Sequence, residues 1–216
     1  MNDAAVKRRG GRPARGDAPL IGEKILAAAT DLFLTRGFGA TSIEAVAARV
    51  QISKRTFYHR FRDKADLFRA VMERLLRRWL PQFDAAFEEP APVAEILARS
   101  ARRMLAVALE PEALALRRLL LTEAERFPEL VGIAIKEGAT KGIERVAQLL
   151  AEATRAGSLQ VADPLFAAIQ FQEMVLSVPM RRAMGFGEPL TEAELDDWAN
   201  RSVALFLHGC GGSPPR

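Results

Sequence analysis

The sequence predicts an all-α protein, on the basis of three observations. Apolar residues recur at helical spacing along nearly the whole chain, and the good helix formers Ala, Leu, Arg and Glu dominate it. No segment shows a strong pattern of alternating apolar and polar residues, which is typical of a half-buried strand. Prolines and glycines separate the periodic segments. With 216 residues, 49% of them hydrophobic, the chain can bury a substantial core.

The N-terminal segment predicts an arm followed by helices. Residues 1–17 are polar and basic and lack apolar periodicity, so we expect a disordered arm. The first helix follows, and Gly37 and Gly39 end it. The segment TSIE, which begins at Thr41, has the pattern of a capping box. It predicts a short second helix of about residues 42–49.

A tight turn and a third helix follow the second helix. Gln51 lies in the turn, and Ser53 is expected to cap the third helix. Phe57 and Phe61 are four residues apart, so both rings face inward from the same side of this helix. Two short helices joined by such a turn form a helix-turn-helix, here at residues 41–60.

Longer helices, rich in leucine and alanine, are expected after a fourth helix that Asp63 caps. Asp163 and Pro164 form an N-cap followed by a proline at the first helical position, and TEAE at residues 191–194 forms a second capping box. We therefore expect about nine helices, of which the last five lie near residues 92–109, 111–126, 128–156, 164–184 and 191–208. A disordered tail follows at 209–216. Two domains are predicted, at residues 18–78 and 79–208.

Charge is distributed unevenly between these two parts. Residues 1–64 hold thirteen Lys and Arg but six Asp and Glu, a net charge of +7, whereas the remainder carries −3. A polyanion partner is therefore expected for the N-terminal part. The N-terminus lacks an apolar signal-peptide core, and no apolar run reaches the ~18 residues that span a bilayer. We expect a cytoplasmic protein without a membrane partner.

No catalytic motif is apparent in the sequence. We find no HExxH, no glycine-rich phosphate loop and no nucleophile elbow. His59 and His208 have no evident partner, and the single cysteine, Cys210, excludes a cysteine metal cluster. We expect no enzyme activity, no cofactor and no metal. A helical interaction module that does not bind DNA is the rival class, and the uneven charge argues against it.

The third helix is the candidate DNA-binding element. With Phe57 and Phe61 facing inward, its free face carries the cations and hydroxyl groups that a major groove accepts. An ordinary solvated helix face is the alternative reading. The candidate DNA-binding residues are Thr41, Ser42, Ser53, Lys54, Arg55, Thr56, Tyr58, His59, Arg60 and Lys64.

The segment from Ile25 to Phe68, ILAAATDLFLTRGFGATSIEAVAARVQISKRTFYHRFRDKADLF, resembles the DNA-binding domain of the TetR family of bacterial transcriptional regulators. The residues that match the family pattern are Phe33, Gly37, Phe38, Thr41, Ser42, Val46, Ala47, Ser53, Lys54, Thr56, Phe57, Tyr58, Phe61, Lys64 and Leu67. Two departures are Gln51 and Arg55, where the family usually has glycine. Gln51 is therefore expected to adopt a left-handed conformation.

The resemblance implies a homodimeric repressor that binds a roughly palindromic DNA operator and is released by a small effector of unknown identity. The candidate pocket residues favour an apolar effector, with an aromatic or a cationic molecule as the alternatives. An effector-free regulator or an activator of the same family is the alternative. The family dimerises through its last two helices, so an apolar stripe on the last helix is the candidate interface, although a stripe packed inside the chain has the same spacing. Its members are Leu195, Trp198, Ser202 and Phe206.

Two further sites follow from the resemblance. Family members often carry a G-R-P segment in the N-terminal arm, so Arg12 and Arg15 are candidate minor-groove contacts, with a solubilising tail as the alternative. The effector pocket is expected between the middle helices, although its candidate residues also suit a plain core. These candidates are Met104, Phe127, Gln170, Phe171 and Met174.

Overall fold

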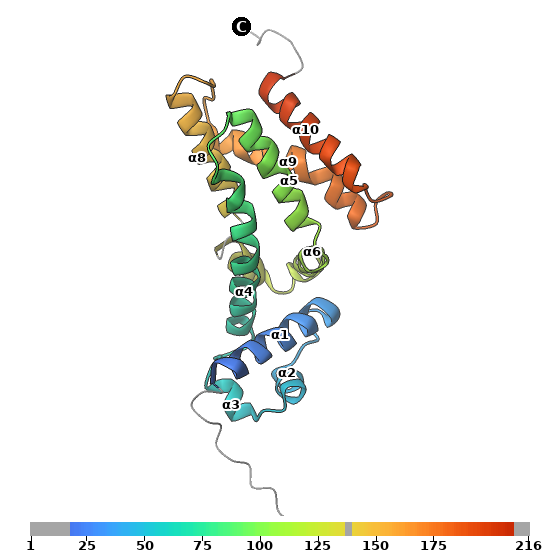
Figure 1. Cartoon of the computed structure of the whole chain (residues 1–216). Helices are drawn as coiled ribbons and strands as arrows, with labels where there is room; N and C mark the ends of the chain where they lie inside the picture. Colours follow the sequence, from blue (N-terminus) through green and yellow to red (C-terminus); the bar gives the residue numbers. More distant parts are fainter. Residues whose placement is uncertain (1–17, 137–139, 210–216) are drawn as a thin grey trace, which may run out of the picture.

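The structure, a computed structural model of the chain, describes residues 18–136 and 140–209. The expected arm at 1–17 with Arg12 and Arg15, and the tail from Cys210 onward, lie outside the described residues. Ten α-helices and no strand occur in the described part, which confirms the all-α prediction. The helices form an elongated molecule in which α1, α2 and α3 occupy one end and α8, α9 and α10 the other (Figure 1).

The first three helices pack around one aromatic core. They are α1 (Ala18–Arg36), α2 (Ile43–Val50) and α3 (Lys54–Tyr58). Phe33 and Phe57 are fully buried and belong to the same cluster as Phe68 of α4 (Lys64–Asp84). The buried aromatic residues thus hold the short α3 in place, although five residues are too few to form a stable helix alone.

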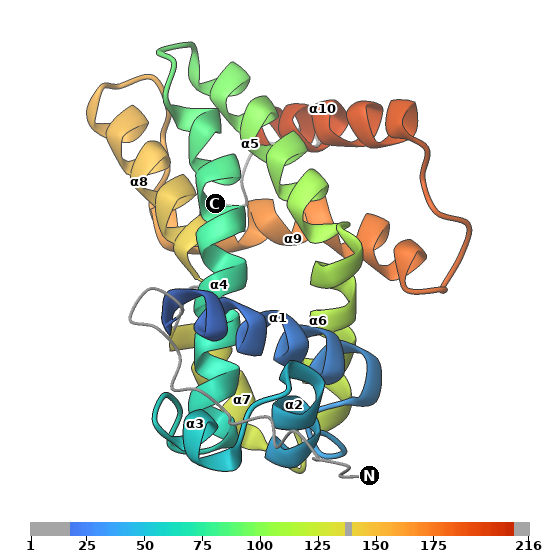
Figure 2. The same cartoon turned by 60° about the horizontal axis from the view of Figure 1, so that its bottom comes forward.

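Helix α4 runs from the N-terminal end of the molecule toward the other helices (Figures 1 and 2). A short 3₁₀ turn (Ala85–Phe87) follows it. The remaining helices are α5 (Val93–Ala108), α6 (Pro111–Glu123), α7 (Pro128–Ala134), α8 (Lys141–Arg155), α9 (Pro164–Ala183) and α10 (Glu192–His208). A second hydrophobic cluster lies among α5, α8, α9 and α10.

Most of the predicted caps are present, and one is displaced. Asp163 caps α9, and Thr191 and Glu194 form the reciprocal capping box of α10. The capping box expected at Thr41 is wrong, because Ser42 is the N-cap of α2 and accepts a hydrogen bond from the Ala45 amide. The helix therefore begins one residue later than the TSIE pattern predicts.

The single helix expected at residues 128–156 is wrong. Two helices, α7 and α8, occupy this range. They pack into different cores: Leu130 and Ile133 of α7 join the cluster around α1 and α4, whereas Val146 and Leu150 of α8 join the cluster around α9. The periodicity of apolar residues in the sequence does not reveal the break.

The apolar stripe on α10 faces the chain's own core. Ser202 is buried, and Leu195, Trp198 and Phe206 pack against the second cluster. The Trp198 indole donates a hydrogen bond to the Val175 carbonyl (3.0 Å), and the Phe206 ring lies 5.1 Å from that of Phe171. The stripe thus contributes to the chain's own core, but Leu195, Trp198 and Phe206 are only half-buried, and their assignment to a dimer interface remains a prediction.

No helix of the described residues is long and apolar enough to cross a membrane.

Candidate DNA-binding site and ligand pocket

Helix α3 and its N-terminal turn lie at the end of the molecule, next to α2 (Figure 2). The Ser53 hydroxyl accepts a hydrogen bond from the Thr56 amide (3.1 Å) and lies 2.9 Å from the Thr56 hydroxyl. This cap starts the helix, and the burial of Phe57 orients it. The side chains of Arg55, Tyr58 and His59 are left exposed to solvent on the other faces.

The turn between α2 and α3 has the left-handed conformation that was expected. Gln51 has φ 59° and ψ 43°, and its amide donates to the carbonyls of Ala47 and Ala48. It is the only non-glycine residue with positive φ among those the structure describes. This backbone reversal closes α2 and directs the chain into α3, so Gln51 maintains the helix-turn-helix geometry despite its side chain.

The two cations at the start of α3 differ in their partners. The Lys54 ammonium lies 2.6 Å from a carboxylate oxygen of Glu44 on α2. The hydrogen bond and charge of Lys54 lower the pKa of Glu44, and the same contacts raise the pKa of Lys54. Arg55 has no such partner among the described residues, so its guanidinium is available to a ligand.

Thr41, a candidate DNA contact, lies inside the domain. Its side chain is buried, and its hydroxyl donates to the carbonyls of Gly37 (2.8 Å) and Leu32 (3.1 Å). These carbonyls lie in the last turns of α1 and directly after its end. Thr41 therefore stabilises the end of α1, and its assignment to the DNA surface is corrected.

Lys64, a second candidate, is also occupied within the chain. Its ammonium donates to the carbonyls of Phe38 (2.8 Å) and Thr41 (3.0 Å) and lies 4.4 Å from the centre of the Phe38 ring. Burial lowers the pKa of Lys64, and the charge of Glu123 opposes that shift. This half-buried cation fastens the start of α4 to the turn between α1 and α2, and its expected role as a phosphate contact remains a prediction.

The same turn contacts the C-terminal end of α6. A carboxylate oxygen of Glu123 accepts a hydrogen bond from the Gly39 amide (3.0 Å), and the Phe127 ring lies 5.0 Å from that of Phe38. Gly37 has φ 88°, and a Cβ there would lie 2.7 Å from Glu123. Glycine thus permits both the left-handed turn and the close approach of the carboxylate.

An apolar pocket of about 310 Å³ lies among α4, α5, α6 and α9. Only Met104 of the five residues expected to line it does so. Phe171 is fully buried in the second cluster, Phe127 packs against Phe38, Gln170 is exposed and Met174 is half-buried outside the pocket. Gln172 lines the pocket and Gln170 does not, because residues two apart on a helix face nearly opposite sides. The residues that sequence reasoning missed include Leu76, Trp79, Phe83, Leu116, Arg117, Leu120, Leu176 and Met180.

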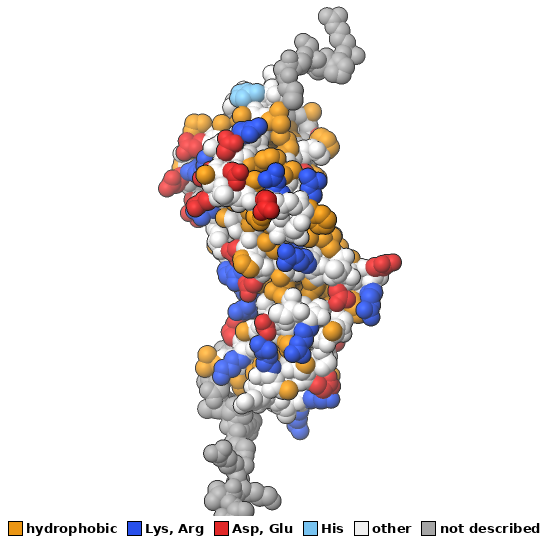
Figure 3. All heavy atoms as spheres, turned by 90° about the vertical axis from the view of Figure 1, so that its right-hand side faces the viewer, with side chains coloured by type: hydrophobic (Ala, Val, Ile, Leu, Met, Phe, Trp, Pro, Cys, Tyr) orange, Lys and Arg blue, Asp and Glu red, His pale blue; other side chains and the backbone are white. Residues whose placement is uncertain are grey.

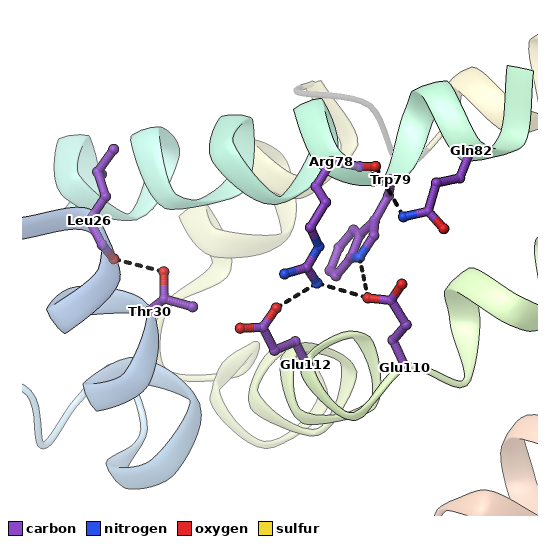
Figure 4. Close-up of polar contacts among 7 residues, drawn as sticks. All are labelled: Leu26, Thr30, Arg78, Trp79, Gln82, Glu110 and Glu112. Carbon is purple, nitrogen blue, oxygen red and sulfur yellow. Dashed lines mark hydrogen bonds and ion pairs between the residues drawn. The ribbon is translucent and has the colours of Figure 1, made fainter. Parts of the chain in front are cut away.

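A polar cluster borders the pocket at Trp79 (Figure 4). The indole N–H and the Arg78 guanidinium both donate to one carboxylate oxygen of Glu110, each at 2.8 Å. Arg78 also pairs with Glu112. Burial acts to lower the pKa of Arg78, but the hydrogen bonds and charges of Glu112 and Glu110 outweigh it and raise that pKa. These contacts fix the indole, whose ring forms part of the pocket wall.

The sequence matches two family profiles that together cover most of the described chain. Residues 25–71 match bacterial regulatory proteins of the tetR family, and residues 95–209 match the C-terminal domain of AefR-like transcriptional repressors. The chain belongs to the TetR family of bacterial transcriptional regulators. The positions of the helix-turn-helix and of the larger helical part in this TetR-family chain agree with the two matches.

Individual relatives agree with this membership. The HTH-type transcriptional regulator RutR of Escherichia coli strain K12 is 35% identical over 96 residues, which are 44% of each chain. The chain therefore spans less than half the length of the curated relatives it matches. A TetR-family regulator from Mesorhizobium loti MAFF303099 is 31% identical, with a TM-score of 0.74 over 90% of this chain and 98% of that chain. The flavonoid-responsive regulator FrrA is 29% identical, with a TM-score of 0.75 over 92% of this chain and 100% of that chain.

Among the described residues, no three His, Cys, Asp or Glu side chains come together as a group that holds a metal ion.

Proposed function

We propose that this protein is a repressor that binds a roughly palindromic operator through α3 and leaves it when a small molecule occupies the pocket. The observation that supports DNA binding most directly is the exposed face of α3, where Arg55, Tyr58 and His59 surround a buried anchor, Phe57. Basic side chains gather over the N-terminal end of the molecule on the face shown in Figure 3. A helix of this kind inserts into a major groove, with cations for phosphates and guanine edges.

A single α3 reads only a few base pairs, so we propose a homodimer that presents two copies to successive major grooves. Helix α9 has an exposed apolar face that suits the contact between copies. Leu165, Phe166 and Ile169 are 53%, 60% and 38% exposed, respectively, and recur on one side of the helix. Leu205 on the neighbouring α10 is 46% exposed. This surface, together with the half-buried stripe of α10, is the proposed interface.

The effector site in this proposal is the apolar pocket of about 310 Å³. Its size lies at the lower end of small-molecule sites. The solved relative FrrA is described as flavonoid-responsive, and the C-terminal family profile is that of a repressor, which supports a repressor with a small effector. We place the DNA-binding domain at residues 18–78 and the effector and dimerisation domain at 79–208, acting in the cytoplasm.

Two helices connect the pocket to the DNA-binding domain. Helix α4 lines the pocket through Trp79 and begins at Lys64, which holds the α1–α2 turn. Helix α6 lines it through Leu116 and reaches the same turn through Glu123. An effector that shifts α4 or α6 therefore changes the spacing of the two recognition helices. It releases the operator only if it binds the non-binding conformation more tightly.

The test begins with selection of bound sequences from random duplexes, followed by binding titrations on the selected operator and its single-base variants. Arg55→Ala is expected to weaken discrimination at one position of each half-site by about 1–3 kcal/mol while leaving binding to random duplex nearly unchanged. Arg155→Ala, on the distant α8, is the matched control. Equal binding of the unaltered protein to selected and random duplexes would contradict sequence-specific recognition.

A further inference from the structure

We infer that the pocket takes a small amphipathic anion, a carboxylate with an apolar body, whose charged end pairs with Arg117. This inference rests on the proposed role of the pocket as the effector site and names the chemical class of its ligand.

The wall of the pocket requires an apolar body. Its lining consists mainly of Leu, Met, Ala, Val, Trp and Phe side chains from the surrounding helices. Met72, Met104 and Met180 contribute three flexible thioethers, which adapt to the shape of a guest. A volume of about 310 Å³ corresponds to roughly ten water-sized groups. The ligand is therefore compact, on the order of an eight-carbon chain or a substituted aromatic ring.

The two acidic groups at the border of the pocket share one cation, Arg78. Glu110 and Glu112 both pair with Arg78, and Glu110 also accepts the indole hydrogen bond of Trp79 (Figure 4). The contact with Glu110 engages the polar edge of Trp79, while the rest of the ring remains available to the pocket. Neither carboxylate lines the pocket, so a ligand inside it does not contact them directly.

The charged side chain that lines the pocket itself is positive. Arg117 is its only charged lining residue among those described, is exposed, and has no hydrogen-bond or ion-pair partner in that part of the chain. It follows Leu116 and lies one turn from Ala113 and Leu120, so it is on the pocket side of α6. The Gln172 amide, also without a hydrogen-bond partner in the described part, supplies a second donor. Guanidinium and amide donors together match a carboxylate.

Trp79 makes binding directly measurable, because it lines the pocket and Trp198 is the only other tryptophan in the sequence. In a Trp198→Phe background, the emission of Trp79 is titrated with octanoate, octanol and octylammonium, which share one apolar chain. Octanoate is expected to bind about fivefold more tightly than octanol, since Arg117 is solvent-exposed and its ion pair is screened. Octylammonium is expected to bind most weakly.

Three variants assign the preference to Arg117. Arg117→Gln should equalise octanoate and octanol, whereas Arg117→Lys should retain part of the preference. Arg103→Gln, at an exposed position of α5 that does not line the pocket, should leave it intact. Unchanged circular dichroism confirms that each variant folds. The inference is overturned if octanol or octylammonium binds as tightly as octanoate, if the preference survives Arg117→Gln, or if no ligand alters Trp79 emission.

A separate titration on operator DNA distinguishes this inference from the proposed function. Octanoate that binds with the expected preference but leaves operator affinity unchanged supports the anionic pocket and contradicts its role as the effector site. Release of the operator by a neutral molecule, with no binding of octanoate, supports the effector site and overturns the anionic preference.

Discussion

Gln51 occupies a backbone conformation that suits glycine better. Its φ of 59° brings a Cβ close to the following carbonyl, which costs about 1–2 kcal/mol for a non-glycine residue. We therefore expect Gln51→Gly to raise the free energy of unfolding by up to about 1 kcal/mol, after allowing for the greater chain entropy of glycine. Urea denaturation measures this change. Gln51→Ala is the control and should not stabilise the protein, because alanine retains the Cβ; a less stable glycine variant would refute the prediction.

The ion pair between Glu44 and Lys54 places a carboxylate beside the proposed DNA surface. Replacing Glu44 with Gln removes this negative charge and frees Lys54 for a phosphate. We expect random and operator duplexes to bind up to about fivefold more tightly at low salt, with the difference fading as salt rises. Fluorescence anisotropy at several salt concentrations provides the measurement.

Asp197→Asn breaks a comparable exposed pair with Arg201 on α10 and serves as the control for Glu44→Gln. It should leave DNA affinity unchanged. Weaker DNA binding by Glu44→Gln would mean that the carboxylate orients Lys54 productively rather than competing with DNA.

At the scale of elements, the start of α4 depends on Lys64. Its ammonium donates to carbonyls in the turn between α1 and α2, so Lys64→Met leaves these acceptors without their donor. We expect the free energy of unfolding to fall by about 1–3 kcal/mol. The salt dependence of DNA binding should remain unchanged, whereas loss of a phosphate contact would reduce its slope by about one unit.

Thermal unfolding and salt titrations of the same preparation test both parts of the Lys64 prediction. Lys141→Met, at an exposed position of α8, controls for the removal of one positive charge. A Lys64→Met variant of normal stability with a flatter salt slope would support the phosphate role and contradict the structural one.

At the scale of the whole molecule, operator binding depends on the contact between two copies. Phe166 is 60% exposed on α9, so Phe166→Asp should not disturb the fold of one chain. It places a charge in the proposed interface, and we expect a monomer at micromolar concentration in sedimentation experiments. Operator affinity should fall by about a hundredfold or more, because a monomer binds only one half-site and loses the gain that a dimer obtains from binding both.

Phe186 is 73% exposed in the connection between α9 and α10 and offers a matched control. Phe186→Asp should remain dimeric and bind the operator normally. A dimeric Phe166→Asp, or an unaltered protein that is already monomeric with and without DNA, would exclude the proposed interface.

The sequence by itself determined the features that depend on neighbours along the chain. Serine at residue 53 predicts a helix cap, the spacing of Phe57 and Phe61 predicts the inward face of α3, and Asp163 followed by Pro164 predicts the start of α9. The left-handed Gln51 followed from the family resemblance, since the family usually has glycine at this position of the turn. These features involve atoms only a few residues apart, so residue identity and spacing suffice to specify them.

Only the tertiary structure decided which partner each group meets. The Lys64 ammonium can donate to phosphate oxygens or to carbonyl oxygens, and the folded turn brings the carbonyls to it. The stripe containing Trp198 suited either a second chain or the chain's own core. Helices α7 and α8 pack into two different cores, which periodicity does not distinguish. Arg117 lines the pocket because α6 packs beside helices that are distant in sequence, such as α9. The physical reason is that hydrophobic burial is non-directional: helical periodicity specifies which face is apolar, but not which surface covers it.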